Sequence, residues 1–241
     1  MNKNLIRVSK SSLGEREKKA VLEVLDNEFL GMGPKVQDFE KHLTSFFNRP
    51  AVCVSNGTAA LQLALQAVHI GPGDEVIVPS FTYLASFQAI SATGAKPIPC
   101  DIMETTLTLD PNDMMDKISS KTKAIMPVHY AGGAGKLDII YQIADENNLR
   151  VIEDAAHAFG SVYKSKKIGS FGDIACFSFD GIKNITSGEG GCIVSNDQTT
   201  LERLRNLRLL AVKGDTKARF SNSRTWIPDV EEQGWRYHMS D

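Results

Sequence analysis

From residue 51 onward, short β-rich runs alternate with segments of helical periodicity, and this alternation limits the chain to few architectures. Seven runs have strand composition: residues 51–55, 74–80, 95–102, 123–129, 149–154, 173–179 and 191–196. The segments between the first five carry apolar residues at helical spacing, and one of these segments opens with Asp110 and Pro111, a cap followed by a first-turn proline. Strands and helices in alternation build a parallel sheet covered on both faces. We therefore predict an α/β fold of three layers, with a mainly parallel seven-stranded sheet flanked by helices.

The alternation stops between the sixth and seventh runs, which are joined by DGIKNITSGEG at residues 180–190 instead of a long helix. This segment places one lysine, Lys183, between an apolar run and a glycine-rich tail. Before the first run, Ser12 and Glu15 have the spacing of a capping box and predict the start of a helix. We expect the apolar residues of this helix and of the next one to pack in the core, namely Val21, Leu22, Val24 and Leu25, then Val36, Phe39, Leu43, Phe46 and Phe47.

Composition and charge exclude several function classes. With 42% hydrophobic residues in 241, the chain can bury one sizeable core. A formal net charge of -2 gives no long-range attraction to nucleic acid or an anionic membrane. No apolar window approaches the ~18 residues of a transmembrane helix. The N-terminus is polar, and the four cysteines form no CxxC pair, so we expect reduced core thiols in a cytoplasmic protein with no metal site.

Two glycine-rich stretches resemble nucleotide-binding loops but fail on spacing. YAGGAGK at residues 130–136 has Tyr130 and Leu137 where a Walker A motif needs glycine and Ser or Thr. GMG at residues 31–33 has no preceding strand and no third glycine, so a turn is favoured.

The residues just after each apolar run are polar as a set, which matters because ligands of open α/β sheets bind at the carboxyl ends of the strands. Gly57 and Thr58 open a helix whose free N–H groups suit a phosphate, although a plain helix cap by Ser55 or Asn56 explains the same pattern. After the second run, Phe81 or Tyr83 could stack on a planar ligand or pack in the core.

Further polar residues follow the fifth and sixth runs. Glu153 and Asp154 end a buried strand, where a carboxylate needs a cationic partner or serves as a helix cap, and His157 follows closely. Ser178 ends the sixth run, and Lys183 comes after it. A phosphate cradle, a stacking aromatic, a buried carboxylate and a lysine are the parts that hold pyridoxal phosphate (PLP), with the lysine as Schiff-base partner and the carboxylate on the pyridine nitrogen.

Five motifs carry a resemblance to a known family over essentially the whole chain: GPKVQDFEKHL, SNGTAALQLAL, GDEVIVPSFTYLAS, VIEDAAHAFGS and GDIACFSFDGIKNITSGEGG. The chain resembles the PLP-dependent nucleotide-sugar aminotransferases of the DegT/StrS type, within the aspartate-aminotransferase fold (fold type I). The resemblance implies that Lys183 binds the cofactor covalently, that Asp154 pairs with the pyridinium nitrogen and that His157 lies against the cofactor. It also implies that Gly57, Thr58 and Ser178 bind the phosphate and that Tyr83 stacks on the ring. Phe81 is then expected to pack in the core.

The family's activity is the transfer of an amino group from an amino acid, expected to be glutamate, to a keto-sugar nucleotide, in amino-sugar and cell-surface polysaccharide biosynthesis. The resemblance further implies a homodimer with a shared active site. PLP-dependent sugar dehydratases of the same family have histidine in place of Lys183 and are disfavoured. A catalytically inactive or truncated protein of this fold, with a binding or regulatory role, stays open as the alternative.

The chain departs from the family pattern near its end. Family members usually read G-Y-N-Y-R-M, and their asparagine reaches the cofactor phosphate of the neighbouring subunit. Here residues 234–239 read GWRYHM, so Arg236 is the candidate for that contact. We assign residues 1–212 to the PLP-binding large domain. Residues 213–241 are expected to form an irregular hairpin or linker that leads toward a small C-terminal domain, and that domain is expected to be absent.

Overall fold

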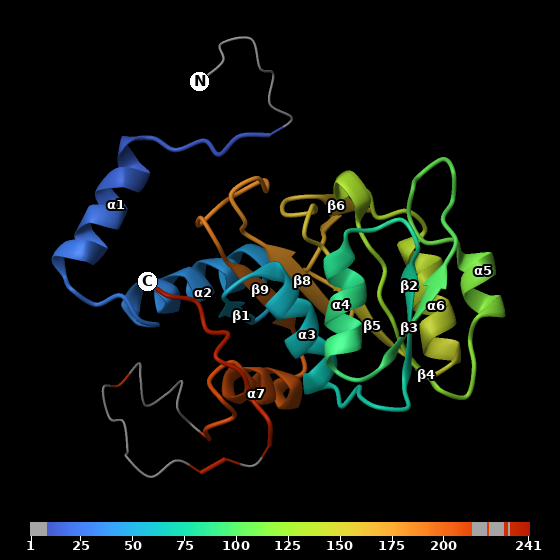
Figure 1. Ribbon diagram of the computed structural model, residues 1–241. Coiled ribbons are helices and arrows are strands. Elements are labelled where there is room, and N and C mark those ends of the chain that lie inside the picture. The colour runs from blue at the N-terminus through green and yellow to red at the C-terminus, as the bar shows by residue number, and fades with distance from the viewer. Residues whose placement is uncertain (1–8, 214–220, 222–228, 231) are drawn as a thin grey trace.

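The computed structural model describes residues 9–213, 221, 229–230 and 232–241, and places one twisted sheet between two layers of helices (Figure 1). The strands of this sheet are β1 (Ala51–Val54), β2 (Glu75–Pro79), β3 (Lys96–Cys100), β4 (Thr122–Ile125), β5 (Arg150–Asp154), β8 (Ile174–Ser178) and β9 (Gly191–Ser195). The helices are α1 (Glu15–Asp26), α2 (Pro34–Phe47), α3 (Gly57–Ala67), α4 (Leu84–Ala92), α5 (Pro111–Asp116), α6 (Leu137–Glu146) and α7 (Gln198–Leu207), with the 3-10 turn η1 (Tyr130–Gly132). The predicted three-layer α/β fold is confirmed.

The sheet contains all seven predicted strands in the order β1-β9-β8-β5-β4-β2-β3. Strand β9 runs antiparallel to both of its neighbours, and the remaining adjacent pairs are parallel. Because β8 and β9 are antiparallel neighbours, a loop can join them without a crossover helix. This geometry explains why the helical alternation stops at residues 180–190. A separate hairpin of β6 (Val162–Tyr163) and β7 (Lys166–Lys167) was not predicted, since its strands are only two residues long.

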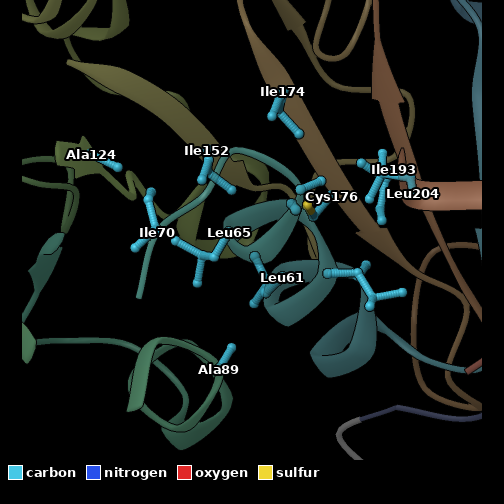
Figure 2. Packing of buried hydrophobic residues seen from close by; sticks show 14 of the residues in the cluster. Leu61, Leu65, Ile70, Ala89, Ala124, Ile152, Ile174, Cys176, Ile193 and Leu204 are labelled. Carbon is cyan, nitrogen blue, oxygen red and sulfur yellow. The ribbon is translucent and has the colours of Figure 1, made fainter. Parts of the chain in front are cut away.

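Helices α3, α4 and α7 cover one face of the sheet, where α3 is almost wholly buried. Its alanine and leucine side chains pack against apolar residues of several strands, and Figure 2 shows Leu61 and Leu65 beside Ile152, Cys176 and Ile193. The opposite face is covered by α2, α5 and α6. Alternate residues of a strand point to opposite faces, so that Val52 and Val54 of β1 join the first cluster while Ala51 and Cys53 join the second.

Helix α1 differs from its prediction in both its start and its burial. The helix is capped at Gly14, whose N–H donates to Glu17 Oε2 at 2.6 Å, so the predicted capping box at Ser12 is wrong. No residue of α1 is buried, and Val21, Leu22 and Leu25 are 51% to 60% exposed. Figure 1 shows α1 (dark blue) standing apart from the sheet. The predicted core face of α2 is confirmed.

The described part of the C-terminal segment packs back onto the sheet and its helices. The backbone N–H of Trp235 donates to Leu207 O at 2.7 Å, and Ser55 N–H donates to Tyr237 O at 2.7 Å. The side chain of Asp241 caps α2 from the far end of the sequence, accepting from Gly33 N at 2.8 Å, Val36 N at 3.0 Å and Lys35 N at 3.1 Å. Because residues 214–220, 222–228 and 231 lie outside the described part, the predicted domain boundary at residue 212 stays a prediction.

All four cysteines are buried and free, as expected. Burial raises the pKa of the Cys176 and Cys192 thiols well above the usual value, which keeps them protonated and unreactive. Within the described ranges, no helix is both long and apolar enough to cross a membrane, and no cluster of three or more His, Cys, Asp or Glu side chains could hold a metal ion.

Candidate active site

A cavity of about 780 Å³ opens at the carboxyl ends of the central parallel strands. Every residue predicted to bind the cofactor within one subunit lines this cavity: Gly57, Thr58, Tyr83, Asp154, His157, Ser178 and Lys183. These residues come from segments that are far apart in the sequence, and the strand order brings their ends to one edge of the sheet. The volume falls in the range of small-molecule and cofactor sites.

The start of α3 forms one end of the cavity. The side chain of Asn56 caps the helix by accepting from Ala59 N at 2.8 Å, so the helix-cap interpretation is confirmed for this residue. The N–H groups of Gly57 and Thr58 belong to the first turn and have no acceptor within the helix. A Cβ atom on Gly57 would lie 2.8 Å from Ser178 Cβ, which is closer than real Cβ contacts come. Glycine thus lets the first turn of α3 approach the hydroxyl of Ser178, and together they form a cradle of anion-binding character.

Asp154 lies at the end of β5 with 6% of its surface exposed. Its Oδ2 accepts from Ser86 Oγ at 2.8 Å, and its Oδ1 accepts from the N–H of Ala156 at 3.2 Å. The hydroxyls of Ser86 and Thr82 are 2.9 Å apart. The carboxylate that borders the cavity is therefore held by donors at both oxygens.

The neighbouring carboxylate, Glu153, points to the other face of the sheet, because successive side chains of a strand alternate. It is fully buried, with His129 Nε2 at 2.6 Å from Oε2, while Tyr141 donates its O–H to Oε1 at 2.6 Å. Burial beside Glu153 raises the pKa of Tyr141 well above its usual value, which keeps the tyrosine protonated as a donor. His129 and Tyr141 therefore satisfy both oxygens of the Glu153 carboxylate. Asp154, and not Glu153, is the carboxylate that borders the cavity.

Lys183 lies half-buried in the loop between β8 and β9, where its N–H donates to Asp180 O at 3.0 Å. Ser11, ahead of α1, donates its hydroxyl to Gly181 O in the same loop. Burial, and then the positive charge of Lys183, lowers the pKa of His157, with Asp154 opposing the shift. The imidazole of His157 is therefore neutral at neutral pH and can serve as a hydrogen-bonding group at the cavity wall.

Two aromatic side chains border the cavity on the segment between β2 and α4. Tyr83 is the cap residue of α4 and is 79% exposed, so its ring is available to a ligand. Phe81 packs against Tyr130, with 4.9 Å between the ring centroids, but it is 44% exposed and lines the cavity, so its predicted place in the core is wrong.

Several cavity residues were not predicted as site residues. Tyr130 and Glu189 follow strands or flank the lysine loop, and their positions after apolar runs could have marked them. Gln62 lies inside a helical pattern that gives no functional signal. The same holds for Ser86, which does not line the cavity but donates to Asp154. Tyr237, next to Arg236 in the sequence, also lines the cavity, and its hydroxyl donates to Gln62 Oε1 at 3.3 Å. Arg236 is exposed and does not border this cavity, so its contact to a neighbouring subunit stays a prediction.

Comparison with known proteins decides the family. The sequence model of the DegT/DnrJ/EryC1/StrS aminotransferase family matches residues 11–241. The chain belongs to this family. The spore coat polysaccharide biosynthesis protein SpsC of Bacillus subtilis (strain 168) is 40% identical over 230 residues, which are 95% of this chain and 59% of SpsC.

Two solved structures that resemble this chain confirm the fold. S. venezuelae DesV, in complex with a ketimine intermediate, superposes with a TM-score of 0.85 at 38% identity, covering 93% of this chain and 58% of DesV. The PLP-form of the putative sugar aminotransferase Spr1654 from Streptococcus pneumoniae gives 0.88 at 30% identity, covering 98% of this chain and 63% of Spr1654. The chain therefore spans about three-fifths of the length of these relatives.

Proposed function

We propose that this chain binds PLP and forms the cofactor-binding part of a sugar aminotransferase. The reaction would move an amino group from an amino acid, expected to be glutamate, to a keto-sugar nucleotide, in amino-sugar and cell-surface polysaccharide biosynthesis. One observation carries the proposal: all seven side chains or backbone positions expected around the cofactor within one subunit meet at a single cavity. Family membership supports the reaction class, and the name of SpsC supports the link to polysaccharide.

The geometry of the cavity fits PLP at each end. The cradle of Gly57, Thr58 and Ser178 suits a phosphate because it combines helix N–H groups with a hydroxyl at a point where a Cβ has no room. Asp154, held by two donors, suits the ring nitrogen. Tyr83 offers an exposed ring for stacking. When bound, PLP supplies an electron sink for the carbon that loses its proton.

Side chains of the protein would carry out the remaining steps of the reaction. Lys183 would hold the cofactor covalently and, once displaced by the amino donor, carry the proton between the donor carbon and the cofactor as general base and acid. Asp154 would keep a positive charge on the ring nitrogen, and each unit added to the pKa of that nitrogen corresponds to about 1.4 kcal/mol. His157, neutral at neutral pH, would orient the cofactor without adding charge.

The test is a reaction of purified protein with PLP, glutamate and a panel of keto-sugar nucleotides, with products read by mass. We expect a visible absorption band on adding PLP, its loss on adding glutamate and an aminated sugar at the end. Lys183→Ala should abolish the band and the product, whereas Lys166→Ala, an exposed lysine of the β6–β7 hairpin, should change neither. Full transamination by Lys183→Ala would refute the assignment.

The alternative is a protein that binds PLP without turnover in a regulatory role. It predicts the visible band with PLP but no change of the band with glutamate or any other amino donor.

We also propose a homodimer in which each site is completed by the partner subunit. Around the cavity, Tyr83, Leu84 and Ile182 are 60% to 79% exposed, and a second copy could cover these apolar groups. Light scattering should give twice the chain mass. If Arg236 reaches the neighbouring site, mixing inactive Lys183→Ala with a weakened Arg236→Ala variant should restore activity in hybrid dimers, and an active monomer would contradict the proposal.

A further inference from the structure

The hydroxyls of Ser86 and Thr82 form a chain that ends on the Asp154 carboxylate. Ser86 lies on α4, is fully buried and donates to Asp154 Oδ2 at 2.8 Å. Its oxygen is 2.9 Å from Thr82 Oγ1. A hydroxyl has one proton to give, and Ser86 gives its proton to the carboxylate. Thr82 must therefore be the donor to Ser86, so both hydroxyls point toward Asp154.

This arrangement supplies a hydrogen-bond donor to each oxygen of the buried Asp154 carboxylate. A carboxylate buried without donors is costly, and bulk water reaches only 6% of this residue. The Ser86 hydroxyl compensates at Oδ2 and the Ala156 N–H at Oδ1. Hydrogen bonds to a charged acceptor are about twice as strong as neutral ones, and a second hydroxyl behind the first polarises it further.

The two hydroxyls also fix where the carboxylate points. Thr82 and Ser86 lie on either side of Tyr83, the cap of α4, which borders the same cavity. Asp154 lies on β5, so the hydroxyl chain ties the aromatic segment to the strand end. A shift of either element would change the distance between the proposed stacking ring and the carboxylate.

We propose that Thr82 and Ser86 are positioning residues for the reaction: their hydroxyls hold the Asp154 carboxylate and aim it at the ring nitrogen of the cofactor. The inference rests on the proposed function, because it assigns the partner of Asp154. Neither hydroxyl needs to touch the substrate. Their effect should therefore appear in the electronic state of the bound cofactor and in turnover, more than in substrate affinity.

The experiment compares Ser86→Ala and Thr82→Val with the conservative variants Ser86→Thr and Thr82→Ser, which keep a hydroxyl. Ser91→Ala, an exposed serine of the same helix, is the matched control. For each protein we would measure the pH midpoint of the visible band, kcat and KM of the reaction with glutamate, and the unfolding of the cofactor-free form.

We expect Ser86→Ala to lower kcat roughly 10-fold, as for loss of one hydrogen bond to a charged group, with KM changed less than about threefold. The midpoint of the band should move by about half a unit or more, and Thr82→Val should act in the same direction but more weakly. Ser86→Thr and Thr82→Ser should lie close to wild type, and cofactor-free Ser91→Ala should match it.

Three results would overturn all or part of the inference, and they are distinguishable. If wild type shows the band and the reaction, but Ser86→Ala has an unchanged midpoint and kcat, the hydroxyls are not positioning residues while the proposed function stands. If wild type shows no band with PLP, the proposed function and this inference fail together. Equal effects of Thr82→Val and Thr82→Ser would likewise exclude a role for the Thr82 hydroxyl.

Discussion

Replacing Gly57 with alanine should damage the phosphate cradle without disrupting the sheet. The added Cβ would lie 2.8 Å from Ser178 Cβ, roughly 0.7 Å short of the ~3.5 Å at which carbon atoms pack. Overpacking of this kind costs about 1–3 kcal/mol, and the better helix propensity of alanine returns at most about 1 kcal/mol. We therefore expect the free energy of unfolding to fall by about 1–2 kcal/mol in urea titration.

Gly57→Ala should cost more free energy in PLP binding than in folding stability. The first turn of α3 must move away from Ser178 to admit the new methyl group, which separates the N–H groups of Gly57 and Thr58 from the Ser178 hydroxyl. Loss of one charge-assisted hydrogen bond corresponds to about 1.5–3 kcal/mol, so PLP should bind roughly 10-fold to 100-fold more weakly in an absorbance titration.

A double variant tests the reason for these losses. Ser178→Gly removes the Cβ and Oγ of residue 178, which are the two atoms nearest to a Cβ on residue 57. The nearest remaining atom is then the Cα of residue 178, at 3.5 Å. Gly57→Ala should then cost almost nothing in stability when it is added to Ser178→Gly, so the two changes should be far from additive. Additive losses, or wild-type stability and PLP affinity in Gly57→Ala alone, would refute the steric argument.

Three further predictions concern other parts of the molecule. The pKa of His157, followed by NMR in cofactor-free protein, should lie below 6.5 and rise in Lys183→Ala, and an unchanged pKa in the variant would contradict this. Because the pKa is depressed in the folded state, His157 should lower the free energy of unfolding as the pH falls below about 6.5. Asp241→Ala should lower the free energy of unfolding by about 1–2 kcal/mol by removing the cap of α2, whereas Asp145→Ala, an exposed aspartate of α6, should not; equal losses would exclude the cap. Leu22→Ala on α1 should cost less than about 0.5 kcal/mol, against about 2–5 kcal/mol for the buried Leu43→Ala on α2, and similar costs would show that α1 is covered in solution.

The sheet and the cofactor cavity could be predicted because their signals are local. Each strand is an apolar run bounded by polar residues, and ligand-binding residues follow such runs, as Asp154 and Ser178 do. Lys183 stood out because it lies beside an apolar run in a segment with no helical period. The family motifs then gave each position a role.

Other features depend on contacts that no local pattern encodes. Val21, Leu22 and Leu25 have the spacing of a buried helix face, yet all three side chains are exposed. Periodicity alone cannot tell which surface a helix will meet. Ser86 looks like an ordinary helical serine until β5 brings Asp154 to it. Asp241 caps a helix more than 200 positions away, which no capping pattern in the sequence can indicate.

The place of β9 between β1 and β8 has a consequence for the order in which the protein is made. Strand β1 pairs with β9 and with no other described strand, and Ala51 faces Val194. During synthesis, β1 leaves the ribosome first and must wait for β9, a long loop closure that delays folding. Since α3 starts directly after β1, the phosphate cradle at the start of α3 is held in place only after β9 has been synthesised and has paired with β1. A nascent chain that stops at Gly190 keeps Lys183 but lacks β9, and it should be unable to bind the cofactor, whereas one that extends past β9 should be able to do so.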